Sequence, residues 1–285
     1  MVRLTEEIPD WRSYPAGVPV AVLVERGDRA LAHGDVVGAG NWYVYANLRG
    51  TPGMREKLAA LIPQLEELAS QENADAKALL GGVILDADSD PVRAARLFKE
   101  ASEAGIIEGK RGLGFLFDNG IGVPEDPVQA NRLFLEAAEA GDGYAAYNLA
   151  VNYYKAHGVR RNAREFMRWL RFGAEQGIPK ASALLGDTLS AQGRDQEALS
   201  WYVKAAESGH TPAMYVAGCW YRDSTGVNAD PVQAVRWFLT MLDSGNGDGV
   251  HDAIQLARTM TDEQIREAGR LSGHETDAEL LIRRR

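Results

Sequence analysis

The chain has 285 residues, of which 45% are hydrophobic and 25% are charged, and its net charge is −9 at pH 7. An acidic chain is poorly suited to nucleic acid, which is bound by basic surfaces. A single cysteine excludes an intramolecular disulfide framework and suits a reducing compartment. There is no signal-peptide pattern and no apolar run of the about 18 residues that a membrane span needs. We therefore expect a cytoplasmic chain that binds neither nucleic acid nor membrane.

The first part of the chain predicts a leader followed by helices. Residues 1–19 hold three prolines and predict an irregular leader. Residues 20–75 predict an N-terminal helical cap, in which Asp35 caps a second helix and residues 54–70 form a third segment. Pro63 lies inside that segment and predicts a kink, because the proline ring clashes with the preceding helical turn.

A stretch of about 36 residues recurs five times between residues 76 and 247. The glycines that end the units are spaced by 36, 36, 32 and 36 residues, at Gly105, Gly141, Gly177, Gly209 and Gly245. A bulky residue lies eight positions before each of them, at Leu97, Leu133, Trp169, Trp201 and Trp237. A period in this range indicates an array of stacked repeats.

Each unit predicts two helices. In the second unit, Gly109, Leu113 and Phe117 lie at i, i+4 and i+8 and so share one face of the first helix. The adjacent Gly114 predicts a close approach of the second helix, because glycine inside a helix costs up to about 1 kcal/mol against alanine. The second helix begins at Asp126-Pro, which caps it, and ends at glycine. Neither helix buries its apolar stripe alone, so the sequence predicts an all-α, right-handed solenoid of stacked helix-turn-helix repeats.

The end of the chain predicts further helices and a tail. Residues 248–273 predict C-terminal cap helices, and residues 274–285 predict a tail that ends in three arginines. Thr276 and Glu279 have the spacing of a capping box. The tail is either frayed or a short helix that docks on an apolar edge.

The repeat pattern resembles the Sel-one-like repeat (SLR), a relative of the tetratricopeptide repeat. It is carried by Leu-Gly pairs at residues 113 and 185, by Gly-Val pairs at residues 122, 158 and 226, and by the Asp…Ala…Trp/Phe…Ala-Ala…Gly run of the second helix. The resemblance implies a non-catalytic protein–protein interaction module, an adaptor or regulatory scaffold that acts as a monomer. Its partner would be a protein or peptide, such as a toxin or a component of a signalling or secretion system. The alternative that the resemblance implies is a bacterial immunity protein that neutralises a cognate toxin.

The tetratricopeptide register also implies which positions face the concave groove. The residues expected to bind a partner there are Arg111, Phe115, Asp118, Tyr147, Tyr154, Asp187, Tyr215 and Arg222. Tyrosine and arginine are typical of binding hot spots. The sequence leaves open whether the tyrosines line the groove or pack between adjacent repeats.

A basic stripe lies on the second helix of the third repeat. Arg161, Arg164, Arg168 and Arg171 follow one another at i, i+3, i+7 and i+10. The stripe is either a solvated face paired with carboxylates or a secondary docking surface for an acidic partner. Because it belongs to a second helix, we expect it on the side opposite the groove.

No residue pattern predicts catalysis, a cofactor or a metal. Asp86, Asp88 and Asp90 resemble the start of a calcium loop, but Pro91 and Leu97 stand where that loop needs glycine and glutamate. This segment therefore predicts an inter-helix loop that ends in a helix cap.

The sequence predicts structural positions, and no catalytic or metal-binding role, for the histidines and the cysteine. The five histidines include no His-x-x-x-His pair and are expected in exposed turns. Cys219 has no metal-ligand companion and is expected as a packed thiol.

Overall fold

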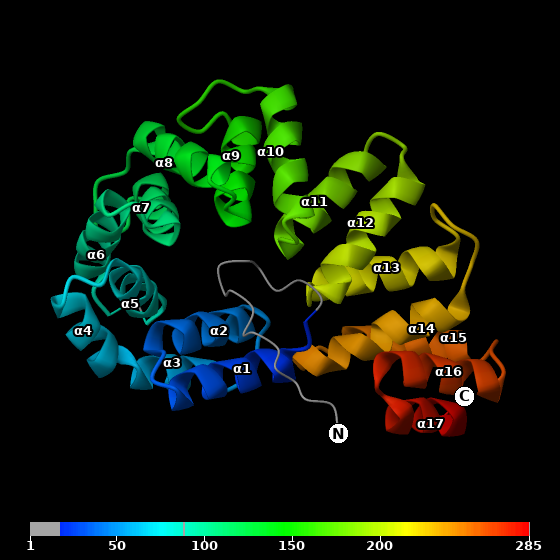
Figure 1. Ribbon diagram of the computed structural model, residues 1–285. Coiled ribbons are helices and arrows are strands. Elements are labelled where there is room, and N and C mark those ends of the chain that lie inside the picture. The colour runs from blue at the N-terminus through cyan, green and yellow to red at the C-terminus, as the bar shows by residue number, and fades with distance from the viewer. Residues whose placement is uncertain (1–17, 88, 285) are drawn as a thin grey trace, which may run out of the picture. The chain divides into compact units, whose positions relative to one another are not determined.

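The computed structural model describes residues 18–87 and 89–284; residues 1–17 of the expected leader, Asp88 and Arg285 lie outside this description. The described residues form seventeen α-helices and one 3-10 helix, with no strand among them. Helices adjacent in the chain pack against each other (Figure 1), which confirms an all-α solenoid of stacked helix pairs. The chain divides into two compact units, the first ending at Gln176 and the second beginning at Gly177.

The first unit contains the N-terminal helices and three helix pairs of the array. Its helices are α1 (Val20–Ala32), α2 (Val36–Leu48), α3 (Met54–Ala60), α4 (Ile62–Ser70), α5 (Ala74–Asp86), α6 (Pro91–Glu103), α7 (Ile107–Asn119), α8 (Pro127–Glu139), α9 (Gly143–Lys155) and α10 (Ala163–Glu175). The array pairs are α5 with α6, α7 with α8, and α9 with α10.

The second unit contains two further pairs, α11 with α12 and α13 with α14, and the C-terminal helices. Its elements are α11 (Pro179–Ser190), α12 (Asp195–Glu207), α13 (Thr211–Asp223), α14 (Pro231–Thr240), the 3-10 helix η1 (Met241–Ser244), α15 (Asp248–Ala257), α16 (Asp262–Ser272) and α17 (Glu275–Arg284).

The Asp-Pro pairs begin second helices as predicted. The side chain of Asp126 accepts a hydrogen bond from the backbone N–H of Gln129 at 3.0 Å. Asp90 accepts one from Arg93 at 2.9 Å, so this aspartate is a helix cap, as the sequence predicts. Each contact satisfies a backbone donor that the first helical turn leaves unpaired.

Small residues of the first helices lie against aromatic rings of the second. A Cβ atom on Gly114 would lie 2.9 Å from the ring of Phe134, and one on Gly218 would lie 2.5 Å from the ring of Phe238. Phe134 and Phe238 are fully buried. The predicted close approach of the paired helices is therefore confirmed.

A third close contact joins successive repeats. Gly158 follows α9 with φ +66°, and a Cβ atom there would lie 2.4 Å from the carbonyl carbon of Pro127, the first residue of α8. Gly122 meets the backbone of Pro91 in the same way, with φ +69°. The Gly-Val pair of one repeat is thus seated on the start of the second helix of the repeat before it.

The N-terminal helices agree with the sequence except in one detail. Asp35 caps α2, since its side chain accepts from the N–H of Gly38 at 2.8 Å. The segment with Pro63 is interrupted, but the break between α3 and α4 falls at Leu61. Pro63 itself lies in the first turn of α4, where its missing N–H costs no helical hydrogen bond.

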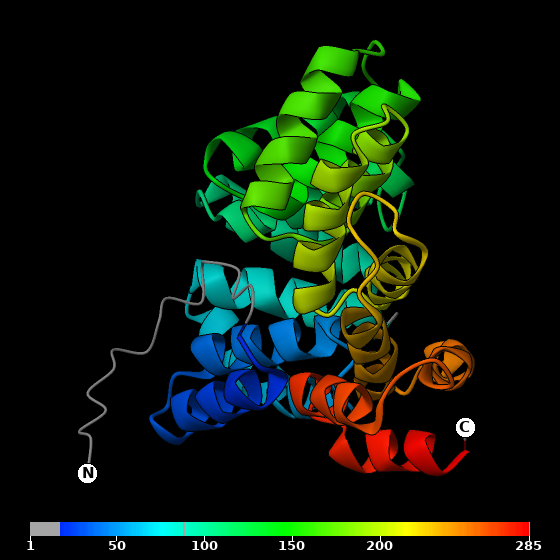
Figure 2. The same ribbon diagram turned by 90° about the vertical axis from the view of Figure 1, so that its right-hand side faces the viewer.

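The C-terminal tail is a docked helix. Helix α17 packs on α16 (Figure 2) and buries Ala278 and Leu281. The capping box predicted at Thr276 is wrong, because α17 already begins at Glu275. A capping box exists instead at the start of α16, between Thr261 and Gln264.

Candidate functional site

Arg111 joins two neighbouring first helices. It lies in α7 and forms an ion pair with Asp142, whose other carboxylate oxygen accepts from the N–H of Ala145 at 2.7 Å and so caps α9. The guanidinium carbon also lies 5.5 Å from the ring centroid of Tyr144. Burial disfavours the charge, but Asp142 and Glu108 outweigh it, so the pKa of Arg111 is raised and the side chain stays charged.

A pocket of about 130 Å³ opens beside Arg111, between α2, α5 and α7. Its lining includes Val44, Ala78, Gly82, Phe98, Glu108 and Arg111. Ala78 and Gly82 stand two positions before and after Leu80, so they occupy on α5 the register that Arg111 and Phe115 occupy on α7. Because both residues are small, this face of α5 is hollow there.

Phe115 and Tyr147 extend this surface along the array. Phe115 lies one turn after Arg111 on α7, and 39% of its surface is exposed. Tyr147 lies on α9 and is half-buried, and this burial raises the pKa of its hydroxyl. Arg111, Phe115 and Tyr147 therefore share one unit and belong to two adjacent first helices.

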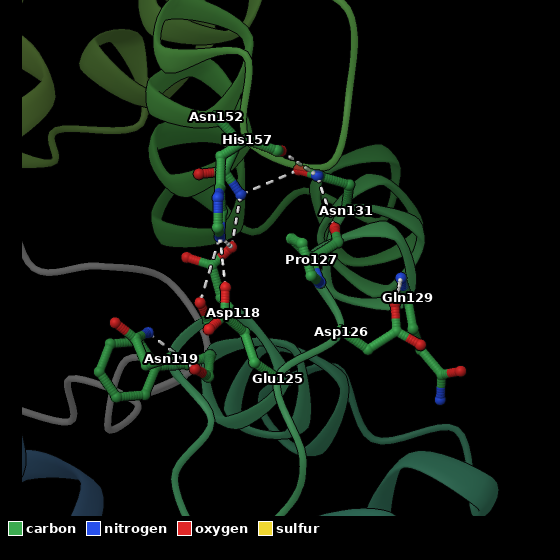
Figure 3. Close-up of polar contacts among 10 residues, drawn as sticks. Asp118, Asn119, Glu125, Asp126, Pro127, Gln129, Asn131, Asn152 and His157 are labelled. Atoms are coloured by element: carbon green, nitrogen blue, oxygen red, sulfur yellow. Dashed lines mark hydrogen bonds and ion pairs between the residues drawn. The ribbon is translucent and has the colours of Figure 1, made fainter.

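Asp118 belongs to a buried polar cluster that the sequence analysis did not foresee (Figure 3). Asn152 donates to the carboxylate of Asp118 at 2.7 Å and to the side-chain oxygen of Asn131 at 3.0 Å. Asn131 and Asn152 are 5% and 3% exposed. His157 lies at the edge of the cluster, with Nε2 3.6 Å from the Asp118 carboxylate.

This cluster holds the loop between α9 and α10 on α8. The side-chain amide of Asn131 donates to the carbonyl of Pro127 at 2.7 Å and to the carbonyl of His157 at 2.8 Å. The carbonyl of Pro127 is the group that Gly158 meets, and the carbonyl of His157 belongs to the residue just before Gly158. Asp118 thus stabilises the joint between two repeats through Asn152.

Tyr154 and the basic stripe meet, although we expected them on opposite sides. The guanidinium carbon of Arg161 lies 5.4 Å from the ring centroid of Tyr154, and the ring of Phe166 lies 5.3 Å from it on the other helix of the pair. Tyr154 is 55% exposed. The stripe lies only partly on the second helix as expected, because Arg161 precedes Ala163, the first residue of α10. On the helix itself, Arg164 is exposed, Arg168 pairs with Glu165 at 3.3 Å, and Arg171 is half-buried.

In the second unit, the expected site residues are tied to their neighbours. Asp187 on α11 accepts from the hydroxyl of Tyr202 at 2.7 Å. Tyr215 and Arg222 on α13 both contact Asp252 on α15, the tyrosine hydroxyl at 3.2 Å. Tyr215 and Arg222 link α13 to α15 much as Arg111 links α7 to α9.

Three histidines correct the expectation of exposed turn residues. His210 is half-buried, and its Nδ1 accepts from the N–H of Ala213 at 3.2 Å, so it caps α13. Burial and then Lys180 lower the pKa of His210. His157 lies in the polar cluster, and His274 contacts Asp243 and Asp277 at 3.1 Å each. The two remaining histidines are exposed.

The described part of the chain holds no group of three or more His, Cys, Asp or Glu side chains placed to bind a metal ion. Cys219 is half-buried, and burial raises the pKa of its thiol. None of the described helices is long and apolar enough to cross a bilayer. The arrangement offers surfaces for recognition: a pocket, exposed aromatic rings and charged side chains.

Comparison with known proteins identifies the repeat. A family model described as Sel1 repeat matches residues 74–106, 107–142, 143–178, 191–210 and 211–246, more than half of the chain. The chain is similar to a Sel1 repeat protein from Oxalobacter formigenes, with 27% identity and a TM-score of 0.55 over 72% of this chain and 86% of that one.

Two further solved structures are similar to the chain. One is a protective antigen with an SLR fold from uropathogenic Escherichia coli, with 25% identity and a TM-score of 0.61 over 93% of this chain and 63% of that one. The other is the immunity protein Pa5087 from Pseudomonas aeruginosa, with 20% identity and a TM-score of 0.46 over 73% of this chain and 80% of that one. Likeness at this last level carries no information about function.

Proposed function

The chain belongs to the Sel1 repeat family, and from this premise we propose that it is a non-catalytic interaction module that binds a protein or peptide partner on the face of its first helices. Arrays of helix pairs expose extended faces of this kind for binding. The observation that carries the proposal is the pocket between α2, α5 and α7, with Phe115 exposed one turn beyond it on α7.

The pocket has the size of one aromatic side chain. Its volume is about 130 Å³, and an apolar cavity of about 150 Å³ is known to hold benzene. Val44, Ala78 and Phe98 supply apolar walls, while Glu108 and Arg111 lie at the margin. A partner side chain seated there would be the buried anchor on which interface affinity mostly depends.

Phe115 and Tyr147 supply contact area beside the anchor. Aromatic side chains offer large contact areas and have few rotatable bonds, so they lose little entropy when a partner orders them. Arg111 is held in place by Asp142, which pre-organises its charge at the margin of the pocket. An adaptor and a toxin-neutralising protein would both use this surface. The captured partner distinguishes the two roles, because a toxin would lose its activity when this chain binds it.

Filling the pocket tests the proposal. A Cβ atom on Gly82 meets nothing within 4 Å, and this residue has an ordinary helical backbone, so Gly82→Leu places a side chain in the pocket without strain. Leucine also favours the helix more than glycine does. The matched control is Ala59→Leu, which adds the same branched side chain at an exposed position of α3.

The assay starts with capture of partners from native lysate and mass spectrometry, followed by calorimetry with the purified partner. We expect Gly82→Leu to raise Kd by at least about tenfold, or about 1.4 kcal/mol, and Ala59→Leu to leave it unchanged. Phe115→Ala should weaken binding as well. Wild-type affinity in both Gly82→Leu and Phe115→Ala would place the binding surface elsewhere.

A further inference from the structure

The loop and helix after α9 carry a charge opposite to that of the chain. Residues 155–171 contain six basic residues and one acidic residue, whereas the whole chain has a net charge of −9. These residues include the last residue of α9, the loop to α10 and α10 as far as Arg171. The positive charge is therefore concentrated at one place on an acidic protein.

An exposed ring lies inside this charge. Tyr154 is the most exposed aromatic side chain among the described residues. Arg161 lies over its ring, and the ring of Phe166 packs against it at a tilt of 42°. Four of the five array repeats carry alanine where this one carries Phe166. Phe166 is buried, so the larger side chain fixes the ring of Tyr154 in place instead of joining the exposed surface.

The arginines next to the ring point to a ligand with carboxylates. Arg160 and Arg161 are exposed in the loop before α10, and Arg164 is exposed in its first turn. The acidic residue of the segment, Glu165, is paired with Arg168 one turn further along. A guanidinium binds a carboxylate through two parallel hydrogen bonds and also stacks on aromatic rings. Tyrosine and arginine side by side are typical of interface hot spots.

We propose that Tyr154, Arg160, Arg161 and Arg164, here called the arginine–tyrosine surface, form a second docking site that binds a short acidic segment of a protein partner. The net negative charge of the whole chain favours a short ligand over a long one. At physiological salt, charges separated by more than about 8 Å are largely screened, so a short acidic segment meets mainly the local positive charge. A long nucleic acid or an anionic membrane would also face the acidic remainder of the chain. This site is distinct from the pocket between α2, α5 and α7 and does not depend on it.

The experiment uses the full chain and a fluorescently labelled oligoglutamate peptide with one tryptophan, with Kd measured by anisotropy across a salt series. The test variants are Arg160→Glu with Arg164→Glu, and Tyr154→Ala. The matched control reverses two exposed arginines in earlier repeats of the same unit, Arg96→Glu with Arg132→Glu. It makes the same change in net charge, so it separates a local surface from the general charge of the protein.

We expect the Arg160/Arg164 double variant to weaken binding by at least about tenfold and to flatten its salt dependence. Tyr154→Ala should weaken it less, and the Arg96/Arg132 control should bind as the wild type does. Circular dichroism checks that each variant is folded. Arg160→Gln with Arg164→Gln replaces the charge reversal if that variant unfolds, and it should weaken binding in the same direction.

Three results would overturn the proposal. The first is a control variant that loses as much affinity as the test variant. The second is a wild type that does not bind the peptide at low salt. The third is tighter binding to phosphatidylserine vesicles or to a single-stranded oligonucleotide than to the peptide, which would assign the surface to a different class of ligand.

Discussion

Gly158→Ala probes the contact that joins successive repeats. Gly158 has φ +66°, and a side chain in this left-handed conformation costs roughly 1–2 kcal/mol. The new Cβ atom would also lie 2.4 Å from the carbonyl carbon and 2.5 Å from the carbonyl oxygen of Pro127. These are backbone atoms that cannot rotate away, and forcing extra atoms into a packed site costs about 1–3 kcal/mol more. The free energy of unfolding should therefore fall by about 2–5 kcal/mol.

Gly105→Ala is the control for backbone strain alone. Gly105 lies in the same unit with φ +87°, but a Cβ atom there has nothing within 4 Å. This variant should lose only about 1–2 kcal/mol. Urea unfolding followed by far-UV circular dichroism gives both values, and hydrogen exchange at the start of α8 shows whether the joint itself loosens. Equal losses in the two variants would refute the close packing of Gly158 on Pro127.

Four other changes test the helix ends and the core. Asp126→Ala removes one cap and should cost about 0.5–2 kcal/mol, whereas Leu149→Ala opens the core and should cost about 2–5 kcal/mol; urea melts that rank them the other way would contradict our assignment of core and surface. Ala156 has φ +60° where the preceding repeat has Gly120, so Ala156→Gly should stabilise the chain by about 1 kcal/mol, seen as a higher urea midpoint. His210 has a lowered pKa in the folded state, so its contribution is present above the unfolded pKa of about 6.5 and is lost as pH falls through the folded pKa. His210→Asn keeps a cap that does not titrate in this range and should lose less stability than the wild type between neutral pH and about pH 5; a parallel decline in both would contradict the role of His210.

The helices and their ends could be predicted from the sequence because their signals are local. Asp126 and its proline lie next to the turn that they begin, and Gly114 lies on the face that it opens to the neighbouring helix. The break near Pro63 was also expected, but its position at Leu61 was not, because proline is equally well placed in the first turn of a new helix. The short segment after residue 274 left two interpretations open, since packing on α16 decides between them.

The site residues were harder to predict because their partners are distant in sequence. Arg111 and Asp118 occupy groove positions by register, yet each has a partner more than 30 residues away, Asp142 and Asn152. Binding of a partner by Arg111 and Asp118 stays a prediction. In the sequence, Asn152 is simply a polar residue within a helix. The pocket on α5 had a usable signal, because the register of Arg111 and Phe115 extends to the small residues Ala78 and Gly82 one repeat earlier.

The joint between repeats also makes whole units exchangeable. Gly122 sits on Pro91 and Gly158 sits on Pro127, and both seats are the first residue of a second helix. If residues 107–142 were missing, Gly158 would arrive at Pro91, a seat that already accepts a glycine of this kind. A deletion of another length would place a residue other than glycine against Pro91, or would leave Pro91 without this contact. Within this stretch the glycine contact is therefore kept when chain is gained or lost in steps of one complete repeat, so the reach of the array can change over evolutionary time while the backbone contact between successive repeats stays the same.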